Sequence, residues 1–290
     1  MDENFRQFLI DGERAGMQYA LTAPRNVPFG LAGNLTGKRP GSSLEFIDHR
    51  EYQPGDDLRR IDWGGFARSD KLTVKLYRDE VNPHLDLVID GSRSMALENC
   101  PKAQATLGLA AVFATAAANA GYSHSTWMAG DGYRRVGNGA DRPSIWQGID
   151  FEYRGDPSTS FAKLPPSWRP YGMRVLLSDL LWPSDPTAAL SRFAERAAAV
   201  ILVQVLSEVD VNPIERGNIR LVDSETGDVQ EIFLDAVAEK RYRAAFAHHQ
   251  ENWNLAAKRA GIVMATVIAE HILSDWRLET LVAAEVLNTA

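Results

Sequence analysis

An acidic residue and two hydroxyl residues stand close together in the segment LDLVIDGSRS, at residues 85–94. The aliphatic run that leads to Asp90 is typical of a strand covered on both faces. Asp90 then falls at the carboxyl end of that strand, where open α/β sheets bind their ligands. Ser92 and Ser94 follow at a spacing that could turn both hydroxyls toward the Asp90 carboxylate. One carboxylate and two hydroxyls form an oxygen-only half-shell, which suits Mg²⁺ or Mn²⁺ rather than soft metals.

The Asp-x-Ser-x-Ser spacing resembles the metal-ion-dependent adhesion site (MIDAS) of von Willebrand factor A (vWA) domains. That resemblance implies two further ligand positions, a Thr or Ser from a second loop and an Asp from a third. Asp179, at the end of the aliphatic segment 173–177, is the third-loop candidate. It would bind the ion through a water molecule or contact the groups that bind the ion directly. In the second loop, the family's spacing to Leu164 selects Ser158, whereas the more usual residue type, Thr159, lies one position away. Both residues therefore remain candidates.

A site of this kind leaves the charge of the ion only partly neutralised, because most of its ligands are neutral hydroxyls. An open coordination position then attracts a carboxylate from another protein, so the resemblance implies metal-bridged protein binding without catalysis. A structural interpretation of the same residues is also open. Ser92 or Ser94 can cap a following helix, and the second-loop hydroxyls can cap the next one.

The residues after position 80 alternate between patterns typical of strands and of helices. Short apolar or alternating segments predict strands at residues 85–89, 125–129, 133–136, 173–181, 200–206, 219–222, 230–234 and 262–268. Longer segments with helix-forming residues, caps or an early proline predict helices at residues 102–120, 187–199, 236–260 and around 276–287. This alternation indicates a doubly wound, Rossmann-like α/β domain of the vWA type, with a mainly parallel sheet, over residues 81–290.

Residues 1–80 have a different character. A helix is expected over residues 5–20, and the Gly-, Pro- and Asn-rich stretch up to residue 41 is typical of a loop. Residues 72–77 alternate between apolar and polar types, as a half-buried strand does. We therefore expect an N-terminal segment of helix, loop and strand, residues 1–80, before the α/β domain.

Residues 41–80 contain several short motifs at defined gaps. Their residues are Glu45, Phe46, Arg50, Tyr52, Gly55, Asp56, Asp57, Arg59 or Arg60, Ile61, Asp62, Trp63, Ala67, Arg68 and Glu80. This set resembles the DUF58 family, bacterial proteins with a vWA-like domain, whose pattern is Glu-Phe, Arg-x-Tyr-x-x-Gly-Asp, Arg-x-Ile-Asp-Trp, Ala-Arg and a strand that ends in Glu. The resemblance implies work alongside a MoxR-type AAA+ ATPase, and other vWA proteins, in assembly, chaperoning or metal insertion.

The same segment carries charges of both signs and interleaved aromatic residues. One interpretation is an ion-pair and aromatic clasp that rigidifies the segment, since arginine pairs with carboxylates through planar, bidentate contacts. The other is a docking face for a partner protein, because Trp, Tyr and Arg are favoured at interface hot spots. The candidate partner-binding residues are Arg50, Tyr52, Asp56, Arg60, Asp62, Trp63 and Arg68.

Composition argues against several classes of protein. The net charge of −7 disfavours an extended nucleic-acid-binding surface. The single cysteine, Cys100, cannot form an internal disulfide, which fits a reducing compartment. The N-terminal segment lacks the apolar core of a signal peptide, and no apolar run reaches the about 18–20 residues that a membrane span needs. We therefore expect a soluble cytoplasmic protein.

No arrangement of residues identifies a catalytic site, so we expect a non-enzymatic protein. The alternative is a metal-dependent hydrolase or phosphatase that uses Asp90 and a strand-end Mg²⁺. Against it, no second carboxylate lies within two residues after Asp90. Ser92 lacks the second glycine of a Gly-x-Ser-x-Gly elbow. The chain has no Walker-type loop for ATP, and its six histidines lack a zinc-binding spacing.

Overall fold

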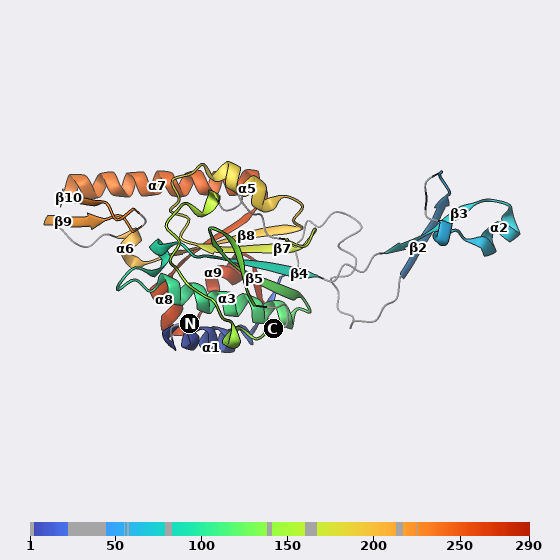
Figure 1. Cartoon of the computed structure of the whole chain (residues 1–290), viewed down its shortest axis with the longest axis horizontal. Coiled ribbons are helices and arrows are strands. Elements are labelled where there is room, and N and C mark those ends of the chain that lie inside the picture. Colours follow the sequence, from blue (N-terminus) through green and yellow to red (C-terminus); the bar gives the residue numbers. More distant parts are fainter. Residues whose placement is uncertain are drawn as a thin grey trace. The chain divides into compact units, whose positions relative to one another are not determined.

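The computed structural model of the chain divides into two compact units (Figure 1). Unit 1 comprises Met1–Asn26 and Pro83–Ala290, and unit 2 comprises Val27–Asn82. The residues whose structure is described are 3–22, 45–54, 56, 58–78, 83–137, 141–159, 167–212, 217–224 and 226–290.

A six-stranded sheet forms the centre of unit 1. Its strands lie in the order β11-β8-β7-β4-β5-β6, and every neighbouring pair is parallel except β5 and β6. The central strands β4 and β7 are buried at every residue, which explains why their sequences are so rich in aliphatic residues. The strands are β4 His84–Asp90, β5 Ser123–Gly130, β6 Gly132–Gly137, β7 Met173–Ser178, β8 Ala199–Leu206 and β11 Val263–Ile268.

Helices cover both faces of this sheet, as a doubly wound fold requires (Figure 1). Helices α1, α3 and α8 lie on one face, and α5 and α7 lie on the other. The α/β fold class with a mainly parallel sheet is therefore confirmed. The helices of unit 1 are α1 Glu3–Gly16, α3 Lys102–Asn119, α5 Pro186–Ala194, α6 Glu208–Val211, α7 Ala236–Arg259, α8 Ala269–Asp275 and α9 Glu279–Ala283, with 3-10 helices η3 Arg93–Ala96, η4 Pro143–Ile145 and η5 Pro157–Thr159.

The N-terminal helix belongs to unit 1, which corrects the expected domain boundary at residue 80. Leu9 of α1 is fully buried. Helix α1 approaches α3 so closely that a Cβ atom on Gly12 would collide with the Gly108 carbonyl. Strand β1 Tyr19–Leu21 then pairs antiparallel with β12 Leu287–Thr289. The sequence pattern predicted the helix, but its packing partners lie too far along the chain for a local pattern to identify them.

Unit 2 is built on an antiparallel pair of strands, β2 Glu45–Glu51 and β3 Thr73–Arg78. Between them in the chain lie the 3-10 helix η2 Leu58–Arg60 and the helix α2 Trp63–Ser69. Of these elements, only β3 was predicted from the sequence pattern. Strand β2 was missed because its pairing contains a register shift, which breaks the apolar–polar alternation of a regular strand. The loop expected up to residue 41 lies outside the described residues.

Most other predicted elements of unit 1 are present with shifted ends. The strands expected at residues 219–222 and 230–234 are present as β9 Gly217–Val222 and β10 Val229–Leu234, which pair antiparallel. The helix expected over residues 187–199 ends at Ala194, and the helix expected around residues 276–287 is reduced to α9. Helix α8 was not predicted, because it follows β11 directly without a Gly or Pro between them. Within the described ranges, no helix is both long and apolar enough to cross a membrane.

Candidate functional site

Asp90 ends β4 at the centre of the sheet and is fully buried. Its Oδ1 accepts a hydrogen bond from the Ser92 amide at 2.8 Å. Its Oδ2 accepts hydrogen bonds from the Ser178 hydroxyl at 2.5 Å and from the Trp182 indole Nε1 at 3.1 Å. Burial, together with the nearby Asp179 carboxylate, raises the pKa of Asp90 to about 6. Donors from the protein itself therefore engage both carboxylate oxygens.

Asp179 follows β7 and faces a buried lysine at the start of α3. Asp179 and Lys102 are each only 1% exposed. The Lys102 Nζ donates to Asp179 Oδ2 at 2.9 Å and lies 3.3 Å from Oδ2 of Asp210 in α6. Although burial opposes the charged form of Lys102, the two carboxylates raise its pKa. A buried ammonium ion thus lies between two carboxylates at the end of the sheet where a ligand was expected.

The turn after Asp179 determines which way these side chains point. Leu180 has a left-handed backbone conformation with φ of 54°, which costs a residue other than glycine about 1–2 kcal/mol. The Leu180 amide donates to Ser178 Oγ at 2.9 Å, and Nε2 of His249 in α7 lies 2.7 Å from the Leu180 carbonyl oxygen. The turn directs Asp179 toward α3 and returns Trp182 to Asp90. Its strain is consistent with a constrained functional or structural site.

The structure brings Ser92 and Ser94 together, as their spacing predicted. Their Oγ atoms lie 3.0 Å apart, and Ser92 is buried while Ser94 is partly exposed. Neighbouring ligands of an octahedral Mg²⁺ stand at about this separation, because each Mg–O bond is about 2.0–2.1 Å long. The hydroxyl pair of the first loop is thus compatible with an oxygen-ligated cation.

Ser158 and Thr159 make hydrogen bonds within their own loop, in η5. The Ser158 amide donates to Asp156 Oδ1 at 2.8 Å, and the Thr159 hydroxyl donates to the Asp156 carbonyl at 2.8 Å. The Thr159 hydroxyl also lies 3.3 Å from that of Tyr153, a residue that forms a backbone bridge with Ser92. The second loop therefore lies beside the first, but its hydroxyl residues have the contacts of a capped turn.

These contacts allow a test of whether the site fits a divalent cation. An Mg²⁺ or Mn²⁺ ion held by the first and third loops would draw on carboxylate oxygens of Asp90 or Asp179. Both carboxylate oxygens of Asp90 already accept hydrogen bonds from the protein, and Asp179 already forms an ion pair with Lys102. A second cation beside a buried ammonium ion meets strong repulsion at low dielectric constant. In the part of the chain described, no group of three acidic, His or Cys side chains could hold a metal. The residues present do not fit a resident divalent ion.

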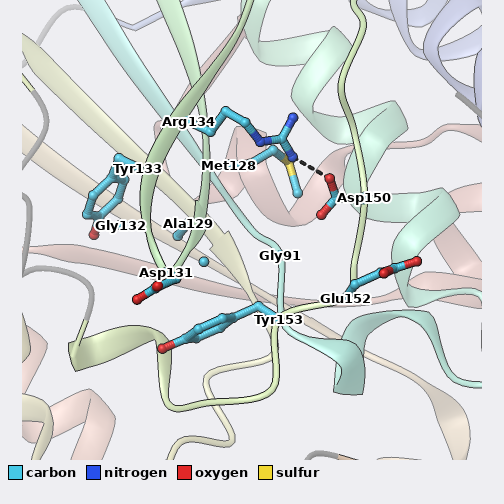
Figure 2. Close-up of a pocket in the computed structure, with 11 residues that line it drawn as sticks. Gly91, Met128, Ala129, Asp131, Gly132, Tyr133, Arg134, Asp150, Glu152 and Tyr153 are labelled. Atoms are coloured by element: carbon cyan, nitrogen blue, oxygen red, sulfur yellow. Dashed lines mark hydrogen bonds and ion pairs between the residues drawn. The ribbon is translucent and has the colours of Figure 1, made fainter.

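A pocket of about 320 Å³ opens beside Gly91, next to the turn between β5 and β6 (Figure 2). Figure 2 shows the side chains of Asp131 and Glu152 on opposite sides of Gly91. A third lining carboxylate, Asp150, pairs with Arg134 at 2.5 Å. The lining therefore has an excess of negative charge. It would repel the partner carboxylate that a metal-bridged site attracts.

In unit 2, several candidate docking residues form ion pairs inside the unit. Asp62 is 9% exposed and lies 2.9 Å from His49 Nε2 and 3.2 Å from Lys75 Nζ. Arg50 pairs with Asp56 at 2.7 Å. These contacts are those of the clasp interpretation, since they tie the strands to the segment that leads into α2. They leave Asp56 and Asp62 poorly placed to bind another protein.

The same contacts lower the pKa of both carboxyl groups. The hydrogen bond from Arg50, followed by that from the Gln53 amide, lowers the pKa of Asp56. The Gly65 amide, followed by neighbouring basic side chains, lowers the pKa of Asp62. Both carboxylates therefore contribute to unit 2 in their ionised form.

Trp63 is a candidate docking residue that stays at the surface of unit 2. It is 60% exposed and begins α2, a helix in which no residue is buried. The Trp63 ring meets Phe66 edge to face, with the centroids 6.4 Å apart. Arg68 is also exposed, but its Nε donates to a carbonyl of its own helix at 3.1 Å. Tyr52 is half-buried, and the Arg60 side chain lies outside the described residues.

Comparison with known proteins identifies the family. The chain matches the family described as "Protein of unknown function DUF58" over residues 48–252. The chain belongs to the DUF58 family. The match confirms the family predicted from the motifs of residues 41–80, and it includes most of the described part of unit 2 and most of the central sheet of unit 1.

Relatives of this DUF58 protein include two uncharacterized mycobacterial proteins. It is 29% identical over 248 residues to one from Mycobacterium tuberculosis and to one from Mycobacterium bovis, and each alignment covers 80% of this chain and 77% of the relative. Among solved structures it is similar to the conserved hypothetical protein BatB from Bacteroides thetaiotaomicron, with 10% identity, a TM-score of 0.28 and coverage of 61% of this chain and 99% of that one. It is also similar to a von Willebrand factor type A protein from Catenulispora acidiphila, with 16% identity, a TM-score of 0.32 and coverage of 61% and 44%.

The sequence pattern of this DUF58 protein did not identify Lys102, the cation that faces Asp179. It also did not identify Ser178 and Trp182, two hydrogen-bond donors to Asp90. Lys102 is the only charged residue of α3 and stands at its N-terminus, where the helix dipole disfavours a cation. A lone lysine in an apolar helix at this position was a usable signal for nearby carboxylates. Ser178 and Trp182 carried no comparable signal, because their contacts with Asp90 depend on the left-handed turn at Leu180.

Proposed function

We propose that this DUF58 protein is a non-enzymatic adaptor that binds a MoxR-type AAA+ ATPase through the exposed face of α2. The observation that carries the proposal is the 60% exposure of Trp63 on a helix that buries none of its residues. Tryptophan is among the residue types most enriched at the energetic centres of protein interfaces. A Trp that stays mostly exposed, although its ring contacts Phe66, is therefore suited to docking.

The contacts around α2 support this assignment, because they hold the helix in a defined conformation. Asp62 precedes α2 and is bound by His49 and Lys75, which lie on the two strands of unit 2. A docking residue on a pre-ordered support loses less conformational entropy when a partner binds. The clasp and docking interpretations of this segment are thus compatible: Asp56 and Asp62 order the unit, and Trp63 is presented by it.

The choice of a MoxR-type ATPase rests on the family resemblance carried by residues 41–80. The family match begins at residue 48 and so includes α2. The surface that we assign to docking therefore lies in the region shared with the family.

The environment of Asp90 gives no support to the alternative of a metal-dependent hydrolase. A carboxylate that attacks a substrate, or activates a water, must reach the reacting atom. Asp90 is fully buried and holds donors from Ser92, Ser178 and Trp182. The hydrogen bonds of Asp90 are better explained by a role in stabilising the fold than by a role in catalysis.

The test is the affinity of the full chain for a purified MoxR-type ATPase, measured by calorimetry or biolayer interferometry. Trp63→Ala should weaken binding by about 30-fold, which corresponds to a hot spot of about 2 kcal/mol. Phe233→Ala is the matched control, because Phe233 is an aromatic residue of unit 1 with a similar exposure of 64%; it should leave the affinity unchanged. Equal binding by wild type and Trp63→Ala would refute the docking face. Turnover of a generic phosphate ester that disappears in Asp90→Asn would refute the non-enzymatic assignment.

A further inference from the structure

Lys102 is a buried cation at which several elements of unit 1 meet. Its Nζ contacts Asp179, which follows β7, and Asp210, which lies in α6. Asp210 Oδ2 also accepts hydrogen bonds from the amide and the hydroxyl of Ser207, both at 2.9 Å. Tyr242 of α7 donates to the Asp210 carbonyl at 2.6 Å. The ammonium ion thus joins α3 to the carboxyl end of β7 and, through Asp210, to α6 and α7.

The position of Lys102 is unfavourable unless the site requires its charge. Burial of an ammonium ion carries a large desolvation penalty, and the first turn of a helix disfavours positive charge. The rest of α3 carries no charge that could compensate. The Asp179 and Asp210 carboxylates offset both penalties, and an Asp179 carboxylate that is 1% exposed in turn requires a cation nearby.

We propose that the Lys102 ammonium group is the permanent cation of the site formed by Asp179 and Asp210 at the carboxyl end of β7. It takes the place that a divalent ion has in vWA-type sites. Asp179 and Asp210 then bind neither Mg²⁺ nor Mn²⁺ in the native protein. A divalent ion with an open coordination position could bind a carboxylate of a partner protein. The Lys102 ammonium group is 1% exposed, so it cannot make such a contact. The inference concerns only the cation of unit 1, so it stands or falls independently of the docking face on α2.

The first part of the test is a titration of the purified full chain with Mn²⁺, followed by calorimetry and thermal unfolding. Wild type should show no saturable heat of binding, and its Tm should stay within about 1 °C in Mn²⁺ and in EDTA. A saturable Mn²⁺ site in wild type that is lost in Asp179→Asn would overturn the proposal.

The second part removes the internal charge. Lys102→Met keeps most of the volume of the buried side chain but frees Asp179 and Asp210, so saturating Mn²⁺ should raise its Tm by about 5 °C or more. Lys102→Arg retains the charge and is the matched control; it should not respond to Mn²⁺. The double variant Lys102→Met/Asp179→Asn should lose the response that Lys102→Met gains.

Each outcome of the second part has a defined meaning. A folded Lys102→Met protein without a Mn²⁺ response would overturn the proposal, because the vacated position would not be a cation site. Refolding of Lys102→Met in Mn²⁺ but not in EDTA would support it as strongly as a rise in Tm. If Lys102→Met does not fold in either buffer, the wild-type titration alone decides.

Discussion

Asp90 and Asp179 of unit 1 are almost inaccessible to water, whereas Asp56 and Asp62 of unit 2 remain in contact with it. In unit 1, burial raises the pKa of Asp90 to about 6, and Asp179 is paired with a lysine that is equally buried. In unit 2, nearby donors and basic groups lower the pKa of both carboxyl groups. We therefore expect the cation beside Asp179 to matter more for stability than the basic groups beside Asp56 and Asp62, which keep some solvent contact.

The largest expected effect is the loss of the buried lysine charge. In metal-free buffer, Lys102→Met should lower the free energy of unfolding of unit 1 by about 3–5 kcal/mol, because two carboxylates lose their cation. Lys75→Met removes a partly exposed cation from Asp62 and should lower the stability of unit 2 by much less. Urea unfolding measures the first change, and hydrogen exchange of unit 2 amides measures the second. Similar losses in the two variants would break the comparison.

Two tryptophans extend the comparison to packing. Trp253 of α7 is fully buried and meets Trp182 edge to face, with the centroids 5.5 Å apart. Trp253→Ala should therefore destabilise unit 1 by about 3–5 kcal/mol. Trp63→Ala should change the stability of unit 2 by no more than about 0.5 kcal/mol, because Trp63 is mostly exposed. Equilibrium unfolding and hydrogen exchange distinguish these outcomes; a strongly destabilised Trp63→Ala would mean that Trp63 is a core residue of its unit.

The two units should also depend on pH in opposite directions. The folded-state pKa of Asp90 is raised from 3.8 to about 6, so its contribution to stability is present below pH 3.8 and is lost as the pH rises through about 6. The pKa of Asp62 is lowered from 3.8, so its contribution is present above that value and is lost as the pH falls through the lowered pKa. Asp90→Asn should flatten the first dependence and Asp62→Asn the second. Unfolding measured between about pH 3 and pH 7 tests both, and unchanged slopes would contradict the assignment of these groups.

The smallest expected effect concerns salt. The Arg50–Asp56 pair is partly exposed, so its contribution should weaken slightly as the ionic strength rises. The Lys102–Asp179 pair is shielded from solvent and should be insensitive to the same change. Hydrogen exchange of unit 2 amides in low and high NaCl, with Arg50→Gln as the salt-insensitive control, checks this. A salt response in wild type that persists in Arg50→Gln would assign the effect to other charges.

The elements that could be predicted from sequence are those whose signals are local. Strands β4 and β8 are aliphatic runs, and α5 begins with the capping residue Asp185 followed by Pro186. Such signals depend only on neighbours in the chain. Strand β2 lacked a local signal because its pairing contains a register shift. The place of α1 in unit 1 depends on contacts with α3 that no local pattern encodes.

The sequence by itself determined the family, the α/β fold and the meeting of Ser92 with Ser94, since motif spacing and strand pattern are properties of short segments. Only the tertiary structure decided which cation faces Asp179, because Lys102 lies 77 residues away in the chain. The left-handed turn at Leu180 then decided the direction of the Asp179 side chain. The charge partner of a buried carboxylate is set by the packing of distant elements, and spacing alone does not contain that information.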